Sequence, residues 1–328
     1  MALLLSRKDV QNLLGMPDAI RIVEEAFKQL ALGQVLMPQR SVIHVGAHGG
    51  VYLGMPAYIG GDLDALAIKI VSVYANNPAK HQLPTTIGTL LLNDPRTGAP
   101  LAVMDAGYLT AVRTGAVSGV ATKYLARANA ARVGVFGAGV QARTQLEGVC
   151  AVRKIRSAAV YDSDASRARE FAQEMSQRLG VSVAAVPEAR AAVEGMDVIL
   201  TASSAGQPIF DGAWLTPGQH INGVGSHSPK ARELDTATIV RSKVVPDLPD
   251  ACLAEAGDIL IPLSEGAITK AHLYAGLGEI VAGLKPGRVN EHEITLFKSV
   301  GLALQDVATA SFVYKKAIET RTGVEFTF

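Results

Sequence analysis

The segment Val133–Ala142 joins a run of β-branched residues to a turn of the form Gly-x-Gly-x-x-Ala. In such a turn Gly137 permits a tight bend, and Gly139 lets the backbone approach a pyrophosphate. Ala142 lets the next helix pack closely, and the N–H groups that begin this helix would bind phosphate oxygens. The segment therefore predicts a dinucleotide site. The residues expected to contact the dinucleotide in this turn are Gly137, Ala138, Gly139, Val140 and Gln141.

Asp162 follows a second β-rich run, Ser157–Tyr161, about 20 residues after the turn. A carboxylate at this place accepts hydrogen bonds from the ribose hydroxyls and repels a 2′-phosphate, so NAD(H) is favoured over NADP(H). Arg167 could accommodate a phosphate, which leaves NADP(H) open. The alternative interpretation of Asp162 is a helix N-cap or a turn acid. Farther along the chain, the residues expected to line the same cofactor site are Ser203, Gly225 and Gly301.

Two cations lie in sequence surroundings that are unusual for surface residues. Lys69 lies between isoleucines in the apolar run Ala65–Val73, where a solvated lysine is a poor explanation. Arg113 lies in a stretch of Ala, Val, Gly and Thr, so we expect its charge to face a crevice. Arginine offers planar paired donors that match a carboxylate. The alternative for each cation is an ion pair with a nearby acid such as Asp105.

The elements that must position these residues form two groups. In the second half of the chain, short β-rich runs alternate with helical stretches, which indicates parallel βαβ units. The expected strands are Ala131–Phe136, Ser157–Tyr161, Ser182–Val186, Val198–Ala202, His220–Val224 and Lys243–Asp247, and the expected helices are Gln141–Cys150, Ala165–Leu179 and Glu188–Glu194.

The first group has a different character. Helices within Ser6–Leu32 precede β-rich runs that are separated by Gly, Pro and Asn clusters, and these runs predict an antiparallel sheet or partial barrel. The runs are Ser41–Val45, Val51–Met55, Ala65–Val73, Thr85–Leu92 and Pro100–Met104. A helix over Leu109–Ala126 follows. A final helix from Glu293 to about Thr320 is expected to return and pack on this first domain.

Composition excludes several classes of protein. The 328 residues are 48% hydrophobic and 19% charged, which is typical of a soluble globular chain. Because 31 basic residues balance 30 acidic ones without a basic cluster, nucleic acid is not an expected partner. We expect no membrane span, no secretory signal and a cytoplasmic location, which suits the two cysteines. No Cys or His spacing is typical of a zinc site, so no metal is predicted.

Along nearly its whole length the chain resembles the ornithine cyclodeaminase/mu-crystallin family of imine-handling oxidoreductases. The matching segments, in order, are Met55-Pro56, Lys69, Asn76–Pro78, Leu83–Thr85, Asp105, Leu109–Thr114, Gly137–Ala142, Pro229, Arg232–Leu234, Glu255–Asp258, Leu277–Glu279 and Thr295–Gly301. The resemblance implies an α/β fold in which a doubly wound Rossmann sheet is inserted into a second α+β domain. It implies a substrate and dimerisation domain of residues 1–118 plus 302–328, an NAD(P)-binding domain of residues 119–301, and a homodimer.

The resemblance also implies that Arg40, Lys69 and Arg113 hold the carboxylate of a small imino or amino acid substrate. Ornithine-cyclising members carry an aspartate where His227 stands in this chain. A carboxylate pairs with the substrate's side-chain ammonium better than an imidazole does. His227 could instead transfer a proton near neutral pH, or it could be a loop histidine without a chemical role.

The expected function is NAD(P)H-dependent reduction of a cyclic Cα ketimine to the cyclic amino acid. The substrate would be Δ1-pyrroline-2-carboxylate or Δ1-piperideine-2-carboxylate, and His227, Lys69 or a water would protonate the imine nitrogen. The alternatives are an alanine dehydrogenase-like enzyme and an ornithine cyclodeaminase, the second disfavoured by His227. A non-catalytic small-ligand binding protein like mu-crystallin is a further alternative, although such a protein has no need of a carboxylate clamp.

Overall fold

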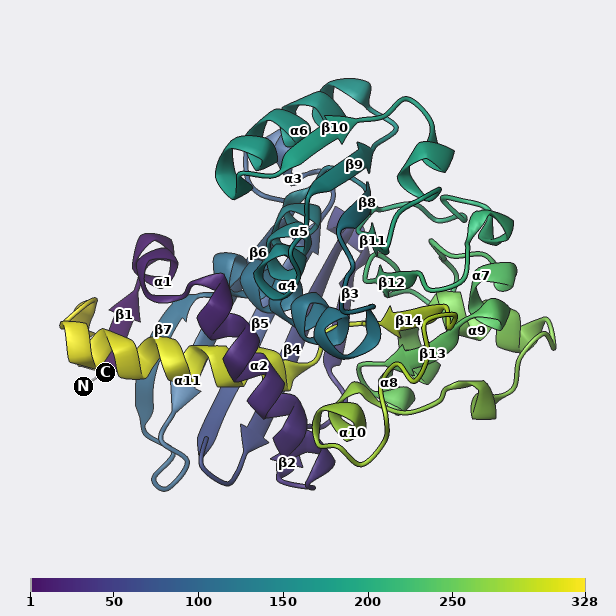
Figure 1. Ribbon diagram of the computed structural model, residues 1–328. Helices are drawn as coiled ribbons and strands as arrows, with labels where there is room; N and C mark the ends of the chain where they lie inside the picture. Colours follow the sequence, from purple (N-terminus) through teal and green to yellow (C-terminus); the bar gives the residue numbers. More distant parts are fainter. Residues whose placement is uncertain (1, 328) are drawn as a thin grey trace. The chain divides into compact units, whose positions relative to one another are not determined.

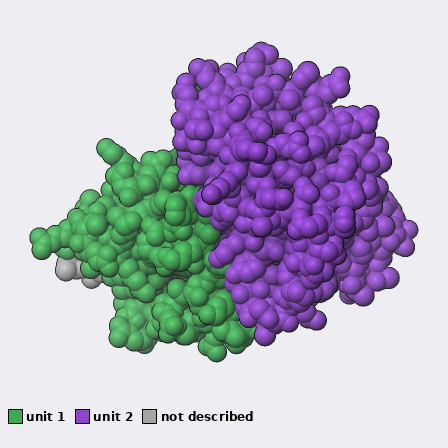
Figure 2. All heavy atoms as spheres, viewed as in Figure 1, with its two compact units in different colours: residues 1–113, 302–328 green, residues 114–301 purple. Residues whose placement is uncertain are grey.

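The computed structural model describes residues 2–327, which divide into two compact units (Figures 1 and 2). Unit 1 consists of residues 1–113 and 302–328, and unit 2 consists of residues 114–301. Unit 2 is therefore inserted into the chain of unit 1, which confirms the predicted fold class. The division falls within helix α4 (Ala106–Leu125), in which the sequence-based boundary at residue 118 also lies.

Unit 1 is built on a mixed sheet of eight strands in the order β15-β1-β7-β6-β5-β4-β2, with β3 paired to β4. The strands are β1 (Ala2–Leu5), β2 (Val35–Leu36), β3 (Ser41–Val45), β4 (Gly50–Ile59), β5 (Ala65–Tyr74), β6 (Thr86–Asn93), β7 (Pro100–Asp105) and β15 (Val324–Phe326). The pairs from β3 to β7 are antiparallel, as predicted, whereas β1 pairs with β7 in parallel. Strands β1 and β15 are too short to have given a periodic signal.

Helices cover one face of this sheet. Helix α11 (Ala303–Thr320) packs on β4, β5 and β6 and also against α2 (Met16–Ala31), as Figure 1 shows. Because side chains alternate along a strand, Lys69 on β5 points to the same face as Ala67 and Val71, beneath α11. Unit 1 also contains α1 (Arg7–Leu13), α3 (Asn77–His81) and the first part of α4.

The predicted helix from Glu293 to Thr320 is wrong in its first part. Residues Thr295–Lys298 form strand β14 in the sheet of unit 2, and α11 begins only at Ala303. A run of four residues, of which two are apolar, is too short to distinguish a strand from a helix by periodicity. Between the two elements Gly301 has a φ of +79°, a conformation that favours glycine and separates them.

Unit 2 contains a parallel sheet of seven strands in the order β10-β9-β8-β11-β12-β14-β13 (Figure 1). The strands are β8 (Arg132–Phe136), β9 (Ser157–Tyr161), β10 (Ser182–Ala185), β11 (Val198–Thr201), β12 (His220–Gly223), β13 (Lys243–Pro246) and β14. Each of the six predicted strands is present, with its ends within one residue of the prediction. The strand order reverses between β8 and β11, and ligands of doubly wound sheets bind at the carboxyl edge of this switch point.

Apolar clusters cover both faces of this sheet, which is typical of parallel sheets. One cluster joins Val133 and Val160 to Phe171, and the other joins Phe136 and Ile221 to residues of the later helices. The helices are α5 (Val140–Val152), α6 (Ala165–Leu179), α7 (Thr236–Arg241), α8 (Pro249–Glu255), α9 (Gly257–Ser264) and α10 (Leu277–Val281). The predicted helix over Glu188–Glu194 is instead a 3-10 turn over Ala189–Ala192. Within residues 2–327 we find no helix that is long and apolar enough to span a bilayer.

Candidate active site

The glycine-rich turn of unit 2 connects β8 to α5. Gly137 has a φ of +92°, and a Cβ there would lie 2.6 Å from the carbonyl oxygen of Ala202, so only glycine fits. A Cβ on Gly139 would meet no described atom within 4 Å, so packing within the protein does not require this glycine. Gly139 instead leaves open space in front of the first N–H groups of α5, which lack partners within the helix. The turn therefore fits the pyrophosphate of a dinucleotide.

Asp162 fixes this turn from the end of β9. Its Oδ2 accepts a hydrogen bond from the N–H of Ala138 at 2.8 Å, and its Oδ1 accepts one from the N–H of Asp164 at 2.9 Å. The helix N-cap is Asp164, whose side chain accepts from the N–H groups of Ser166 and Arg167. Each oxygen of Asp162 can accept a second hydrogen bond, so the carboxylate remains suited to a ribose hydroxyl. Its contact with the ribose stays a prediction.

Arg143, on the first turn of α5, also belongs to this site. The glycine-rich motif did not predict it. Its guanidinium donates to the carbonyl oxygens of Ala138 and Gly139 and forms an ion pair with Glu174 at 2.7 Å. It also lies over the ring of Phe171. These contacts hold the peptide planes of the turn. A cation so close to the positive end of a helix is unfavourable unless it has such partners. An arginine at this position of the sequence could therefore have indicated a structural role.

The other three predicted cofactor residues lie after strands of the same sheet. Ser203 follows β11 and Gly225 follows β12, and their N–H groups donate to the two oxygens of Glu233 at 2.6 and 2.8 Å. Gly301 follows β14, and its N–H donates to Asp247 at 3.0 Å. The N–H groups of these three residues therefore donate to the buried carboxylates of Glu233 and Asp247. Any contact with a dinucleotide must be made by other atoms of the three residues. Whether they bind it stays a prediction.

In unit 1, two of the three predicted cations share one buried carboxylate. The Nζ of Lys69 lies 2.8 Å from Oδ2 of Asp306, and the Nε of Arg113 lies 2.9 Å from Oδ1. Arg113 also donates to the side-chain oxygen of Gln305. Lys69 is 1% exposed, Arg113 4% and Asp306 0%, so all three charges are removed from water.

The partner acid is not the one that the sequence suggested. Asp105 accepts a hydrogen bond from the N–H of Tyr108 at 3.0 Å, at the start of α4. Asp306 lies 193 residues from Arg113 in the chain and reaches it only because α11 packs on the sheet. Lys69 and Arg113 can therefore form ion pairs with Asp306 and also bind a substrate carboxylate, because one role does not exclude the other.

The cluster has more positive than negative charge. Burial and the nearby charges of Arg113 and Arg40 together lower the pKa of Lys69 to about 8, against the opposing effect of Asp306. Arg40, which is half-buried, therefore lies close enough to act on the same cluster. A bound carboxylate would supply the missing negative charge, because buried charges are stable only when they are paired.

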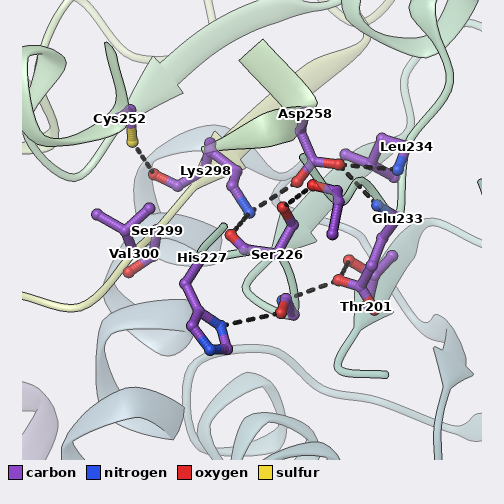
Figure 3. Close-up of polar contacts among 12 residues, drawn as sticks. Thr201, Ser226, His227, Glu233, Leu234, Cys252, Asp258, Lys298, Ser299 and Val300 are labelled. Atoms are coloured by element: carbon purple, nitrogen blue, oxygen red, sulfur yellow. Dashed lines mark hydrogen bonds and ion pairs between the residues drawn. The ribbon is translucent and has the colours of Figure 1, made fainter. Parts of the chain in front are cut away.

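His227 lies in the loop after β12 and is exposed. Its Nδ1 is 3.1 Å from the carbonyl oxygen of Gly225 (Figure 3). The catalytic role of His227 stays a prediction. In the part of the chain that the structure describes, no group of three His, Cys, Asp or Glu side chains could hold a metal ion.

A dinucleotide turn on a doubly wound sheet, in one chain with a buried cationic cluster, defines a class: nicotinamide-dependent oxidoreductases that act on small carboxylic acids. The chain belongs to the ornithine cyclodeaminase/mu-crystallin family, whose sequence model matches residues 1–321. This match confirms the resemblance that the sequence segments indicated.

Three relatives show how close the similarity is. A solved structure of Thermococcus litoralis Δ1-pyrroline-2-carboxylate reductase, in complex with NADH and L-proline, is 50% identical, with a TM-score of 0.96 over 99% of this chain and 100% of that one. An archaeal alanine dehydrogenase dimer with bound NAD is 38% identical, with a TM-score of 0.94 over 100% and 99%. The Δ1-pyrroline-2-carboxylate reductase of Bacillus thuringiensis subsp. konkukian is 37% identical over 99% of this chain and 100% of its own length.

Proposed function

We propose that the protein is an NADH-dependent Δ1-pyrroline-2-carboxylate reductase that forms L-proline. The observation that carries the proposal is the buried cluster of Lys69, Arg113 and Asp306, whose surplus positive charge suits one carboxylate. The relatives named for Δ1-pyrroline-2-carboxylate or bound to proline support a five-membered ring as the substrate. The six-membered Δ1-piperideine-2-carboxylate is the nearest alternative.

In this proposal Arg40, Lys69 and Arg113 bind the substrate carboxylate. Hydride transfer to the imine carbon is the chemistry that NADH would supply when bound, and a protein group would supply a proton to the imine nitrogen. Lys69 suits this second role, because a pKa of about 8 keeps it charged at neutral pH yet makes it a stronger acid than an ordinary lysine. Its ammonium has three N–H donors, more than the ion pair with Asp306 requires. His227 is the second candidate for the proton donor.

A substrate panel tests the function. With NADH, Δ1-pyrroline-2-carboxylate should give a kcat/KM at least about 10-fold above those of Δ1-piperideine-2-carboxylate and of pyruvate with ammonia, because one ring carbon is worth roughly 1–3 kcal/mol in a fitted pocket. L-Ornithine with catalytic NAD⁺ should give little proline, since His227 offers its side-chain ammonium no anionic partner. The readouts are NADH absorbance and chromatographic detection of proline.

Other outcomes of this panel would each replace the proposal. Faster turnover of pyruvate and ammonia would make the protein an alanine dehydrogenase, which the similarity to the archaeal dimer keeps as the second candidate. Efficient release of ammonia from ornithine would make it a cyclodeaminase. Tight binding without turnover of any member would indicate a small-ligand binding protein.

Asp162 gives the prediction for the cofactor. The wild type should have a higher kcat/KM with NADH than with NADPH, because this carboxylate repels a 2′-phosphate. Asp162→Ser should narrow the ratio by about 10-fold, the effect of removing one close like-charge contact of roughly 1.4 kcal/mol. Asp164→Ser is the matched control, since the side chain of Asp164 caps α6 by accepting from the N–H groups of Ser166 and Arg167. Equal use of both cofactors by the wild type would disprove this role of Asp162.

We also propose that the protein is a cytoplasmic homodimer. The sheet face of unit 1 opposite Lys69 carries large exposed apolar side chains: Ile43, Tyr52 and Ile87 are 59%, 41% and 41% exposed. Strand pairing places these three side chains in one row across the sheet together with Ser72. Exposed apolar side chains gathered on one face are typical of a protein–protein interface, and the archaeal alanine dehydrogenase is a dimer. Light scattering, which measures mass in solution, should give twice the 34.4 kDa of the chain.

The proposed cytoplasmic location is supported by the free thiols of Cys150 and Cys252, which suit a reducing compartment.

A further inference from the structure

Three buried charged residues bind together the carboxyl ends of neighbouring strands in unit 2 (Figure 3). Glu233, Asp258 and Lys298 are each 0% exposed. The carboxylate of Glu233 accepts three hydrogen bonds: from the hydroxyl of Thr201 at 2.9 Å, and from the N–H groups of Ser203 and Gly225 at 2.6 and 2.8 Å. One side chain thus fixes the loop that follows β11 and the loop that follows β12.

Lys298, the last residue of β14, extends this group to a third strand. Its Nζ donates to the carbonyl oxygen of Ser226 at 2.8 Å and lies 2.8 Å from Oδ2 of Asp258. The other oxygen of Asp258 accepts from the N–H groups of Glu233 and Leu234 at 2.8 and 2.9 Å. Asp258 therefore anchors both the lysine and the backbone that carries Glu233.

The charges of this group are held in their buried positions by one another. Burial would lower the pKa of Lys298, but attraction to Asp258 and Glu233 outweighs it and raises the pKa, so the lysine stays cationic. Burial raises the pKa of Glu233, against the hydrogen bonds and the charge of Lys298. Apolar side chains of similar volume usually fill such a place at lower cost in free energy. Residues 202–211 and 224–235 form no helix or strand. The charged group therefore supplies the hydrogen bonds that fix the backbone conformation of these two loops.

We propose that Glu233, Asp258 and Lys298 are positioning residues for the nicotinamide half of the bound dinucleotide. In a doubly wound sheet the two halves of a dinucleotide lie on either side of the switch point. Asp162 at the end of β9 marks the adenosine side, so the loops after β11 and β12 mark the nicotinamide side. Removing the carboxylate of Glu233 should disorder these loops and leave the adenosine side intact. The inference rests on the proposed function only in taking NADH as the cofactor.

The test compares two ligands in calorimetry with the full chain and without substrate. Glu233→Gln should raise the Kd of NADH by about 10-fold, the effect expected from weakening hydrogen bonds to a charged group. The Kd of ADP-ribose, which lacks nicotinamide, should stay within about 2-fold. Thr201→Val removes one hydrogen bond to Glu233. It should therefore raise the ratio of the NADH Kd to the ADP-ribose Kd by about 3-fold. This milder variant decides the matter if Glu233→Gln does not fold.

Asp197→Asn is the matched control. Asp197 is 8% exposed and accepts from the N–H groups of Ala131 and Arg132, both at 2.9 Å, at the amino end of the sheet. This variant should lower the melting temperature without changing the ratio of the NADH and ADP-ribose Kd values. Equal weakening of both ligands by Glu233→Gln, or no change in either, would overturn the inference. If the wild type reduces none of the imines, the proposed function fails, while the ratio of binding constants still decides the role of Glu233.

Discussion

Replacing Lys69 by alanine is expected to lower kcat/KM for Δ1-pyrroline-2-carboxylate by about 10⁴-fold and to leave the Kd of NADH within about 2-fold. Loss of one charged hydrogen bond to the substrate carboxylate accounts for about 10² of this effect, and loss of the proton donor for the rest. Arg113→Ala removes a contact to the substrate carboxylate but no proton donor, along with the contacts of Arg113 to Asp306 and Gln305, and should lower kcat/KM by about 10². Steady-state kinetics and calorimetry measure the two quantities. A comparable loss of NADH affinity would place these cations in the cofactor site instead.

The pH dependence separates the two roles of Lys69. Because its pKa is about 8, the wild type holds the cation below this pH and loses it above, so kcat/KM should fall as pH rises through about 8. Lys69→Arg keeps the charge at all these pH values, and should lose this decline while working more slowly. His227→Asn should keep the decline. If His227→Asn removes it instead, His227 is the proton donor.

Replacing Asp306 by alanine is expected to lower the free energy of unfolding by roughly 3–5 kcal/mol, because it leaves Lys69 and Arg113 buried without their shared partner. It should also lower kcat/KM by at least about 10²-fold, since the two cations lose the anchor that orients them. Denaturant unfolding and steady-state kinetics measure these changes.

The control for Asp306→Ala is Asp18→Ala on the surface of the same unit. Asp18 is half-buried and pairs with Arg21 at 3.3 Å and with Lys316 at 3.6 Å, and because these pairs are partly screened by water its removal should cost under about 1 kcal/mol. If the two variants have the same unfolding free energy, the buried pairs contribute no more than a surface pair. The description of Asp306 as the structural centre of the cluster would then be wrong.

The dinucleotide side of the protein could be predicted from sequence because its signals are local. The turn at Gly137 and Gly139 needs particular residue types within a few positions, and the strands of unit 2 alternate with helices at regular spacing. The charged partners could not be predicted in this way. Asp306 meets Arg113 across 193 residues, and Lys298 meets Asp258 across the packed sheet. Such pairs depend on tertiary packing, which leaves no pattern in a short window.

The insertion of unit 2 also determines the order in which the chain can fold during synthesis. Lys69 and Arg113 leave the ribosome before any of unit 2, whereas Asp306 on α11 follows its last residue. The sheet of unit 1 therefore lacks its covering helix, and its two cations lack their carboxylate, while the inserted sheet already has its complete sequence. Domains usually form from the amino terminus onward during translation. In this chain unit 2 is the first unit whose sequence is complete, so it can fold first. The sheet of unit 1 stays without its covering helix α11 until the end of the chain has been synthesised.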